Sequence, residues 1–276
     1  MTRKISIQGF EGSFHQMAAL SFFKEDIEII PCATFKEVVE LAADTQKTNG
    51  GVMAIENSIA GSILPNYKLL QRSNLQISGE VYLQINQHLM VNHGVSLNDI
   101  KEVHSHPMAL QQCQDYLDQH QWKQVETEDT ALSAKHVKRH NSKHIAAIAG
   151  SLAAEIFQLK ILAPAIQDEK NNYTRFLVLE PHGNQPLDKV NKASIQFQAK
   201  HLQGSLAKIL TEIARHDINL SKLQSVPIPG SNWKYNFYAD LEFETIEKFE
   251  AALYQVKKLA ETVKVFGIYK KGKTIK

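Results

Sequence analysis

Residues 171–179, NNYTRFLVL, join a polar stretch directly to an apolar one. The run over 176–179 is continuously apolar, which is typical of a short strand that is buried on both faces. Thr174 and Arg175 would then lie at the mouth of this strand, held by a rigid element. A cluster of breaker residues at 181–186 follows at once and ends the unit. We therefore expect this strand to close the first domain and to carry its chemistry.

Length and composition are those of an ordinary soluble globular protein with room for two domains. The chain has 276 residues, of which 43% are hydrophobic and 22% charged, with a formal net charge of +2. Lysine and arginine are spread along the chain, so nothing favours nucleic acid as a partner. No apolar run approaches the roughly 20 residues of a membrane span, and we expect no signal peptide before Arg3. With only Cys32 and Cys113, we expect a reducing cytoplasm and no membrane partner.

The N-terminal part alternates apolar runs with helical patterns. Residues 4–8 predict a strand, and the glycine turn 9–13 leads from it into a helix over 14–23. Such a turn presents backbone N–H groups to an anion, but two close glycines are also common wherever a strand turns tightly into a helix. Residues 28–31 predict a second strand, and the capping box 34–37 opens a second helix.

The next apolar run, 51–55, predicts a central strand that ends in Glu56, Asn57 and Ser58. In open α/β sheets, ligands bind outside the carboxyl ends of the strands, so these three side chains are candidates for chemistry. In the alternative interpretation, Asn57 and Ser58 only cap the following helix and Glu56 is a surface charge.

A second lobe is expected after two extended segments within residues 75–91. There, Ser105 lies at the junction between a strand and a helix predicted over 107–117, and Gln112 lies on the flank of that helix. Two lobes would each offer such a junction to a shared cleft. Ser105 beside His106 does not predict a hydrolase, because adjacent side chains on an extended chain point apart and no Gly-x-Ser-x-Gly elbow is present.

A metal site is not expected. His136, His140 and His144 are close in sequence, but they lie among cations and lack acidic or cysteine partners at ligand spacing.

The C-terminal part predicts a βαββαβ order, which is a ferredoxin-like split motif. The expected strands cover 193–199, a segment that ends at Pro227, 233–244 and 263–269. The first helix begins near Gly204, and the second contains Phe249 and Ala260.

Five segments, taken in order, are specific as a set. They are Gly9-x-x-Gly12-Ser13-Phe14, Glu56-Asn57-Ser58-x-x-Gly61-Ser62, Ser105-His106-Pro107-x-Ala109-Leu110-x-Gln112-Cys113, Ala146-Ala147-Ile148-Ala149 and Gln167-Asp168-x-x-x-Asn172-x-Thr174-Arg175-Phe176. With them the chain resembles, over nearly its whole length, the prephenate dehydratases of phenylalanine biosynthesis that carry a C-terminal ACT regulatory domain.

The resemblance implies a two-lobed α/β catalytic domain, periplasmic-binding-protein-like (type II), followed by an α+β ferredoxin-like ACT domain. The catalytic domain would cover 1–181, with lobe 1 at about 1–80 and 168–181 and lobe 2 at about 81–167; a linker would cover 182–191 and the ACT domain 192–276. The implied activity is that of a hydro-lyase, the decarboxylating dehydration of prephenate to phenylpyruvate, CO₂ and water, with no cofactor. The implied partners are prephenate, L-phenylalanine as effector, and further copies of the chain in a homodimer or homotetramer.

By matching position, the resemblance makes Thr174 the principal catalytic residue. Its hydroxyl would hydrogen-bond to the departing hydroxyl of the substrate, while the proton would come from Glu56 with a raised pKa or from a water. Arg175 is expected to bind a carboxylate through two parallel N–H bonds. Asn57, Ser105 and Gln112 are further catalytic candidates, and Ser13, Ser58, Thr130 and Asn172 are further substrate-binding candidates.

The effector site implied by the resemblance comprises Gly204, Ser205, Leu206, Ala207, Asn219, Leu220, Gln224, Ser225 and Pro227. Where the family usually has Glu-Ser-Arg-Pro, this chain has Gln-Ser-Val-Pro over 224–227, which removes one acidic and one basic partner of an amino acid. Phenylalanine is still the expected effector, with backbone groups as its main partners.

Two alternatives remain open. Phe10 and Met108 depart from the usual family residues at the rim of the cleft and leave the choice between prephenate and arogenate undecided. The other alternative is a non-catalytic sensor that binds a small acid in the same two-lobed domain and signals through the ACT part.

Overall fold

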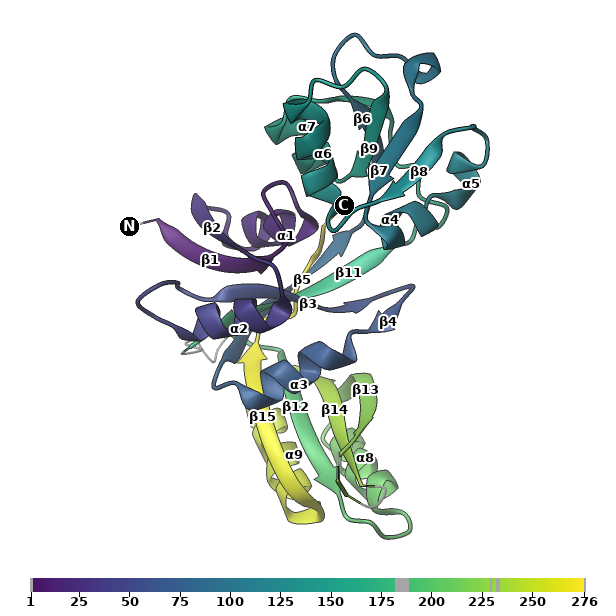
Figure 1. Ribbon diagram of the computed structural model, residues 1–276. Coiled ribbons are helices and arrows are strands. Elements are labelled where there is room, and N and C mark those ends of the chain that lie inside the picture. Colours follow the sequence, from purple (N-terminus) through teal and green to yellow (C-terminus); the bar gives the residue numbers. More distant parts are fainter. Residues whose placement is uncertain (1, 182–188, 229, 232–233, 276) are drawn as a thin grey trace.

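The structure is a computed structural model that describes residues 2–181, 189–228, 230–231 and 234–275. Its strands form three sheets, and Figure 1 shows the largest of them between the other two. The upper and middle bodies in that view are the two α/β lobes, and the lower body is built from C-terminal residues. None of the helices in these ranges has the length and apolar character needed to cross a membrane.

Lobe 1, the middle body, has helices on both faces of a mixed sheet. Its strands are β1 (Arg3–Gln8), β2 (Ile27–Cys32), β3 (Gly51–Asn57), β4 (Gly61–Ser62), β5 (Gln76–Gln84), β11 (Tyr173–Glu180) and β16 (Thr274–Ile275). They are ordered β16-β5-β11-β3-β1-β2, with β4 beside β3. Helix α1 (Phe14–Phe23) packs on one face, and α2 (Phe35–Ala43) and α3 (Leu64–Arg72) pack on the other.

Lobe 2 has a sheet of the order β10-β6-β9-β7-β8. These strands are β6 (His88–Val91), β7 (Glu102–Ser105), β8 (Lys123–Glu126), β9 (Ile145–Ala149) and β10 (Lys160–Ala163). The helices of this lobe are α4 (Pro107–Gln111), α5 (Gln114–Leu117), α6 (Thr130–Arg139) and α7 (Ser151–Ile156), with a short 3₁₀ turn, η1 (Leu97–Asp99).

The single helix predicted over 107–117 is wrong, because the chain breaks between α4 and α5. The cause is Asp168, which is distant in sequence. Its carboxylate accepts hydrogen bonds from the backbone N–H groups of Gln114 and Asp115 at 3.1 and 3.2 Å. Its own N–H donates to the carbonyl of Gln112 at 2.8 Å. Asp168 therefore satisfies backbone groups on both sides of the break and starts a second helix.

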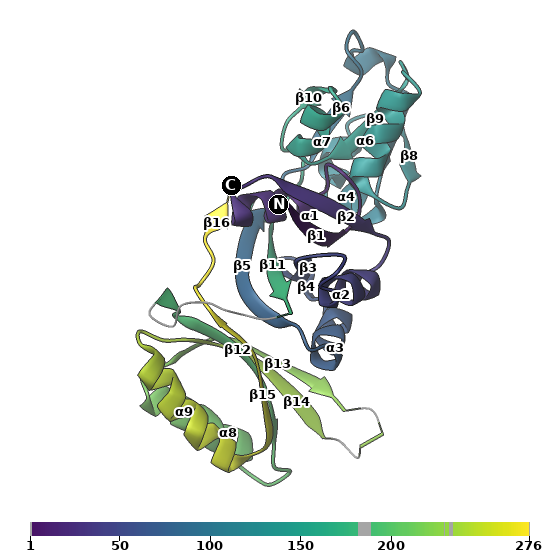
Figure 2. The same cartoon turned by 90° about the vertical axis from the view of Figure 1, so that its left-hand side faces the viewer.

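The C-terminal domain confirms the predicted βαββαβ order. It consists of β12 (Lys192–Ala199), α8 (Ser205–Arg215), β13 (Asn219–Pro227), β14 (Tyr235–Glu242), α9 (Ile246–Leu259) and β15 (Ala260–Tyr269). Its sheet has the order β13-β14-β12-β15. Figure 2 shows α8 and α9 on the outer face of this sheet, while the inner face is turned toward lobe 1.

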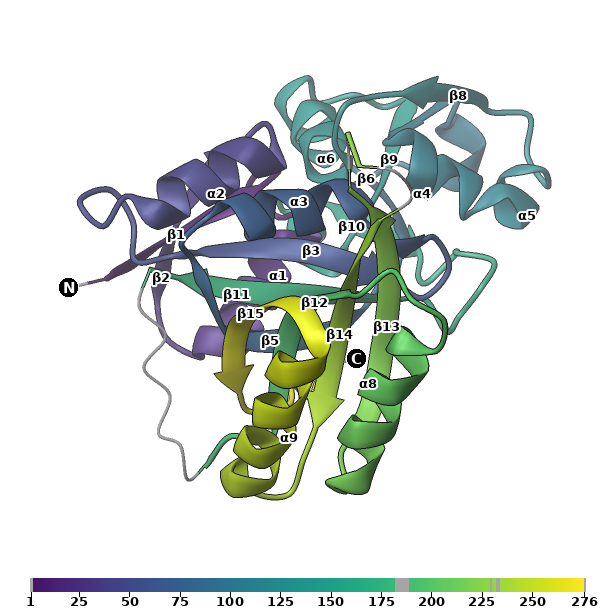
Figure 3. The ribbon, with the colours of Figure 1, turned by 90° about the horizontal axis from the view of Figure 1, so that it is seen from below.

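Strand β11 lies at the centre of lobe 1 and is buried on both faces, as predicted. Phe176 and Val178 pack into the core around α1, whereas Leu177 and Leu179 pack into the core that α2, α3 and the C-terminal domain share. The sides alternate because successive side chains of a strand point to opposite faces. Seen from below in Figure 3, β3 and β11 run across the strands of the C-terminal sheet. One face of β11 therefore packs against α1 within lobe 1, and the other faces the domain interface.

The domain boundaries differ from the predicted ones in two places. β5 continues to Gln84, so the division expected between residues 80 and 81 falls inside a strand. After β15 the chain returns to lobe 1, where Thr274 and Ile275 pair in parallel with Tyr82 and Leu83. The end of the chain is thus part of the first sheet rather than of the C-terminal domain. Most of the predicted linker, residues 182–188, lies outside the described residues.

The contact between β15 and β5 predicts a large cost for a methyl group at Gly267. A Cβ atom at this position would lie 2.1 Å from the carbonyl oxygen of Ile77, which is backbone and cannot rotate away. We expect Gly267→Ala to lower the free energy of unfolding by about 3 kcal/mol through overpacking, as measured by urea denaturation. Gly94→Ala is the control, because Gly94 has a positive φ but open space around it, and it should cost about 1 kcal/mol. Equal costs would contradict the close contact.

Candidate active site

A cavity of about 290 Å³ lies between the two lobes. Ser13, Asn57 and Thr174 line it from lobe 1, and Gln112 and Thr130 line it from lobe 2. Five predicted site residues from distant parts of the sequence therefore meet at one cavity. The described residues that line it include no lysine or arginine, so an anion bound there would depend on neutral donors and backbone N–H groups.

The turn 9–13 brings the lobes close together. Gly9 and Gly12 both have positive φ angles, of 92° and 88°. A Cβ atom on Gly9 would lie 2.9 Å from Oδ2 of Asp129, and one on Gly12 would lie 2.9 Å from Cα of Ala153, both in lobe 2. The two glycines are thus required by backbone conformation and by the approach of lobe 2, which is a reason that the sequence alone does not reveal.

Asn57 and Thr174 form the centre of a polar wall on the lobe 1 side of the cavity. They are paired residues on β3 and β11, and Asn57 Nδ2 donates to Thr174 Oγ1 at 3.0 Å. Asn57 Oδ1 accepts from the backbone N–H groups of Ile59 and Ala60 at 3.0 and 2.9 Å, which fixes the orientation of the amide. Because the amide can only donate toward Thr174, the threonine oxygen accepts and its own proton is free to be donated elsewhere.

A row of three side-chain amides, those of Asn57, Asn172 and Gln112, connects the lobes. Asn172 is fully buried; its Oδ1 accepts from Asn57 at 2.7 Å, and its Nδ2 donates to Gln112 Oε1 at 3.2 Å. Gln112 comes from lobe 2, so this chain of amides runs from the polar wall across the cleft. With its oxygen occupied, Gln112 can offer its amide nitrogen to a ligand. Ser58 does not line the cavity; it bonds to the backbone at Asn171 and Tyr173 and so holds the start of β11.

Two helix N-termini supply further donors. Ser13 is the N-cap of α1, and Asp129 is the N-cap of α6, whose first residue is Thr130. All three line the cavity. The N-terminus of a helix favours an anion, but at α6 the carboxylate of Asp129 already takes this place, accepting from Leu132 N–H at 2.8 Å. The N-terminus of α1 is the better anion site.

Sequence reasoning missed three residues that line the cavity. His15 is buried, and desolvation lowers its pKa to about 3, so the neutral ring accepts a hydrogen bond from Ala54 N–H at 3.3 Å. Burial also raises the pKa of Asp129. The buried Oε1 atom of Gln87 has no partner among the described residues. An aspartate directly before a helix is a capping signal that could have found Asp129. His15 lies within an apolar helical run and Gln87 among the polar residues of 84–88, where no spacing marks a site.

Comparisons with known proteins fit this cleft. A family model described as "Prephenate dehydratase" matches residues 5–184. The chain belongs to the prephenate dehydratase family. It is 37% identical to "Arogenate dehydratase/prephenate dehydratase 1, chloroplastic" of Arabidopsis thaliana over 96% of this chain and 71% of that protein. It is 33% identical to "Bifunctional chorismate mutase/prephenate dehydratase" of Aquifex aeolicus over 98% of this chain and 74% of that protein.

Solved structures match the chain over both the two lobes and the C-terminal domain. The prephenate dehydratase of Arthrobacter aurescens in complex with L-Phe is 25% identical, with a TM-score of 0.84 and coverage of 97% and 90% of the two chains. A protein described as "GqqA- a novel type of quorum quenching acylases" is 27% identical, with a TM-score of 0.87 and coverage of 98% of each chain. The predicted fold class, two lobes followed by a C-terminal antiparallel sheet, is confirmed.

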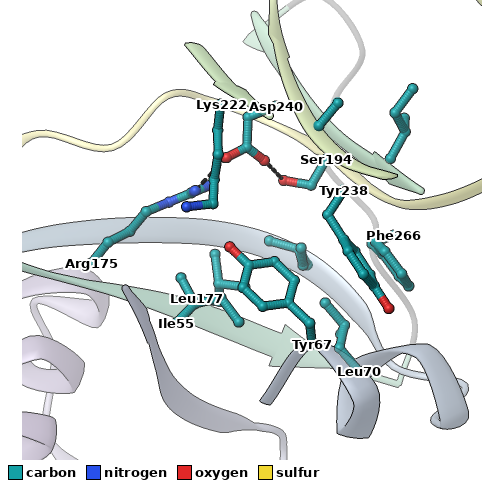
Figure 4. Close-up of a pocket in the computed structure, with 13 residues that line it drawn as sticks. Ile55, Tyr67, Leu70, Arg175, Leu177, Ser194, Lys222, Tyr238, Asp240 and Phe266 are labelled. Atoms are coloured by element: carbon teal, nitrogen blue, oxygen red, sulfur yellow. Dashed lines mark hydrogen bonds and ion pairs between the residues drawn. The ribbon is translucent and has the colours of Figure 1, made fainter. Parts of the chain in front are cut away.

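Arg175 does not reach the cleft of this prephenate dehydratase family member, so its predicted role as the carboxylate ligand is wrong. It follows Thr174 on β11, and therefore points to the opposite face of the sheet. Its Nε donates to Glu80 at 2.7 Å, and its other nitrogens bond to Asp240 and to Tyr269. Figure 4 shows the guanidinium directed at Asp240 of the C-terminal domain. Burial lowers the pKa of Arg175, but the charges of Asp240 and Glu80 outweigh it and raise the pKa.

The proposed acid, Glu56, also faces away from the cleft. It pairs with Arg175 across β3 and β11, and its Oε1 accepts from Nζ of Lys222 at 2.5 Å. Ser105 is likewise absent from the cavity lining. It is fully buried, and its hydroxyl donates to the carbonyl of Ile148 at 2.6 Å, which holds β7 to β9. The direct catalytic parts predicted for Glu56 and Ser105 are therefore wrong.

The predicted effector residues divide into two groups. Gly204, Ser205, Leu206 and Ala207 line a hollow of about 410 Å³ at the start of α8, together with Tyr235 and Phe237. The β13 residues do not line it: these are Asn219, Leu220, Gln224, Ser225 and Pro227. Among the described residues, no three His, Cys, Asp or Glu side chains gather as metal ligands would.

The raised pKa of Asp129 predicts an unusual pH dependence of stability. Because the folded state holds this proton to a higher pH than the unfolded state does, ionisation above the ordinary value of 3.8 destabilises the fold. We expect Asp129→Asn, which keeps an N-cap, to gain stability relative to the wild type as the pH rises from about 4 to 7, in urea denaturation.

Asp44→Asn is the matched control with the opposite sign. A hydrogen bond from Lys47 lowers the pKa of Asp44, so its ionised form stabilises the fold above the unfolded pKa. Asp44→Asn should lose stability relative to the wild type chiefly as the pH rises to about 4, with little further change up to pH 7. A parallel trend in the two variants would contradict the assignment.

Proposed function

We propose that the protein catalyses the decarboxylating dehydration of prephenate to phenylpyruvate, CO₂ and water, a hydro-lyase reaction of phenylalanine biosynthesis. The observation that carries this proposal is the Asn57 and Thr174 pair at the cleft, within the residues 5–184 that match the family. The reaction releases hydroxide and CO₂ from a ring that becomes aromatic, and the hydroxide takes up one proton to become water.

The geometry suits Thr174 as a hydrogen-bond donor to the leaving hydroxyl of prephenate. Its oxygen accepts from Asn57, so its proton can be donated to the hydroxyl of the substrate as negative charge develops there. A threonine is too weak an acid to give up this proton without replacement. With Glu56 on the far face, the sources that remain are water in the cleft and the Asp129 carboxyl group, whose pKa is raised.

The carboxylates of prephenate would be held by neutral donors. Gln112 offers its amide nitrogen, and α1 offers the backbone N–H groups of its N-terminus next to Ser13. Phe14 and Phe35 line the same cavity and would pack against the ring. The contacts proposed for Gln112 and for the helix end at Ser13 are thus made by neutral donors and not by an arginine.

Arogenate is the second candidate substrate. It carries an ammonium group, and the cavity lining includes the carboxylates of Glu128 and Asp129, which could accept it. The plant relative named above is described as both an arogenate and a prephenate dehydratase. Turnover of the two substrates by the same preparation, compared as kcat/KM, decides between them.

Removal of the Thr174 hydroxyl tests the chemistry. We expect Thr174→Val, which keeps the shape of the side chain, to lower kcat about 100-fold or more with little change in KM, because the lost contact acts on the leaving group. Thr174→Ser keeps the hydroxyl and should retain most of the activity. The measurement is the ultraviolet absorbance of phenylpyruvate formed from prephenate.

A wild type that binds prephenate without turnover would refute the enzyme and support the sensor alternative. A Thr174→Val variant with the kcat of the wild type would refute the role of the hydroxyl alone.

We propose further that the protein binds L-phenylalanine as an effector, in a homo-oligomer whose size is open, and that it works in the cytoplasm. The hollow at α8 combines a helix N-terminus, which suits a carboxylate, with the rings of Tyr235 and Phe237, which suit a phenyl group. The thiols of Cys32 and Cys113 are free and buried, which suits a reducing compartment.

A carboxylate added at the start of α8 tests the effector site. We expect Ser205→Asp to abolish phenylalanine binding by charge repulsion in isothermal titration calorimetry, while an acidic residue at this end remains favourable to the helix. Thr211→Asp, on the same helix but outside the hollow, should bind as the wild type does. No heat from the wild type at millimolar phenylalanine would reject the effector, and unchanged binding by Ser205→Asp would reject this site.

A further inference from the structure

The two strands that carry the polar wall of the cleft are held from behind by the C-terminal domain. Asn57 and Thr174 are paired on the cleft face of β3 and β11, and their chain neighbours Glu56 and Arg175 are paired on the opposite face. Each member of this rear pair forms an ion pair with a different strand of the C-terminal domain. Glu56 bonds to Lys222 of β13, and Arg175 bonds to Asp240 of β14.

The contact at Lys222 joins three strands. Its Nζ donates to Glu56 Oε1 at 2.5 Å and to Ser62 Oγ at 2.8 Å. Ser62 lies on β4 and is the pairing partner of Glu56. One ammonium group from the C-terminal domain therefore holds β3 and β4 together on both sides of the turn that orients the Asn57 amide. The Lys222 side chain is 11% exposed, so the contact is largely shielded from solvent.

The contact at Arg175 is deeper. The Arg175 and Asp240 side chains are 5% and 7% exposed, and Ser194 also donates to Asp240. The cavity between the two contacts is only about 10 Å³, room for at most one water, and Figure 4 shows Arg175, Lys222 and Asp240 converging on it. The interface behind the polar wall is thus tightly packed and leaves little room for water.

The backbone at this place needs such support. The pairing of β11 with β3 shifts by one residue between Arg175 and Phe176, so that Arg175 opposes Glu56 but Phe176 opposes Ala54. At a bulge the ladder is interrupted and does not by itself fix the direction of the side chains. Contacts that hold Glu56 and Arg175 therefore also fix where the adjacent Asn57 and Thr174 point.

We propose that Lys222 and Asp240 are positioning residues, through which the C-terminal domain sets the geometry of the Asn57 and Thr174 pair in the cleft. The kinetic part of this inference rests on the proposed function, whereas its structural part does not. Lys222 gives the sharper test, because its partner Glu56 is 34% exposed and can be hydrated when the lysine is removed. Loss of Asp240 would leave the buried charge of Arg175 without a partner and endanger folding.

The test compares Lys222→Met with Lys264→Met. Lys264 is a matched control, since it also reaches from the C-terminal sheet to lobe 1, where it donates to the carbonyls of Gln71 and Ser73 at 2.8 and 3.1 Å. These residues are at the end of α3 and not beside the polar wall. We expect Lys222→Met to lower kcat for prephenate by about 10- to 100-fold with KM within about twofold, as for misplaced catalytic groups. Lys264→Met should keep kcat within about twofold.

Two further variants separate positioning from chemistry at Glu56. Glu56→Gln should lower kcat as much as Lys222→Met does. The double variant should have a kcat no lower than either single variant, because both break the same ion pair between Lys222 and Glu56. Lys222→Arg should recover most of the lost kcat. A loss in Glu56→Gln that is much larger than in Lys222→Met would overturn the inference, because Glu56 would then act chemically.

Amide hydrogen exchange supplies a measurement that is independent of the reaction. Peptides that cover 52–58 and 172–178 should exchange faster in Lys222→Met than in Lys264→Met, by about tenfold or more, because local opening at the bulge becomes easier. Equal protection in the two variants overturns the inference. A wild type that does not convert prephenate refutes the proposed function, and the exchange comparison then decides the inference by itself.

Discussion

The alternation of side chains along β11 is the constraint on which the structure depends. Thr174 points into the cleft and Arg175 points into the domain interface, because neighbours on a strand face opposite sides of a sheet. The same is true of Asn57 and Glu56 on β3, which pair with Thr174 and Arg175. One short segment therefore serves the cleft and the attachment of the C-terminal domain at once. A substitution on one face therefore acts on the backbone that carries the side chains of the other face.

The attachment is electrostatic at its centre and apolar around it. Arg175 and Lys192 are buried with Glu80 and Asp240, so that two cations balance two anions, and Lys192 donates to Glu80 at 3.0 and 3.1 Å. Breaking one such buried contact usually costs about 3–5 kcal/mol, although the network as a whole contributes little net stability. Beside these charges, the rings of Tyr238 and Phe266 stack with their centroids 5.9 Å apart.

Much of the fold could be predicted from local pattern, and most of the errors concern which face of an element meets which neighbour. The apolar run after Arg175 indicated a strand buried on both faces, and the capping box at 34–37 marked the start of a helix; both were confirmed. In β12, however, Lys192, Ser194 and Gln196 alternate with apolar residues, a pattern typical of a solvent-facing side. All three are buried instead. Lys192 donates to Glu80 of lobe 1, more than a hundred positions away, and Ser194 bonds to Asp240 and Tyr269. Local sequence carries no information about such a partner, and for the same reason it could not assign Arg175 and Glu56 to the interface.

The placement of Arg175 changes how the cleft must treat an anion. Without a cation in the described lining, the favourable field comes from amide dipoles and from the N-terminus of α1, each a partial charge fixed by the backbone. At the opposite wall, Asp129 cancels the corresponding end of α6 and adds negative character. The cleft is therefore polarised from lobe 1 to lobe 2. Such a field is weaker than that of an arginine. In the proposed reaction, the donors beside Thr174 would therefore stabilise most strongly the negative charge that develops on the departing hydroxyl.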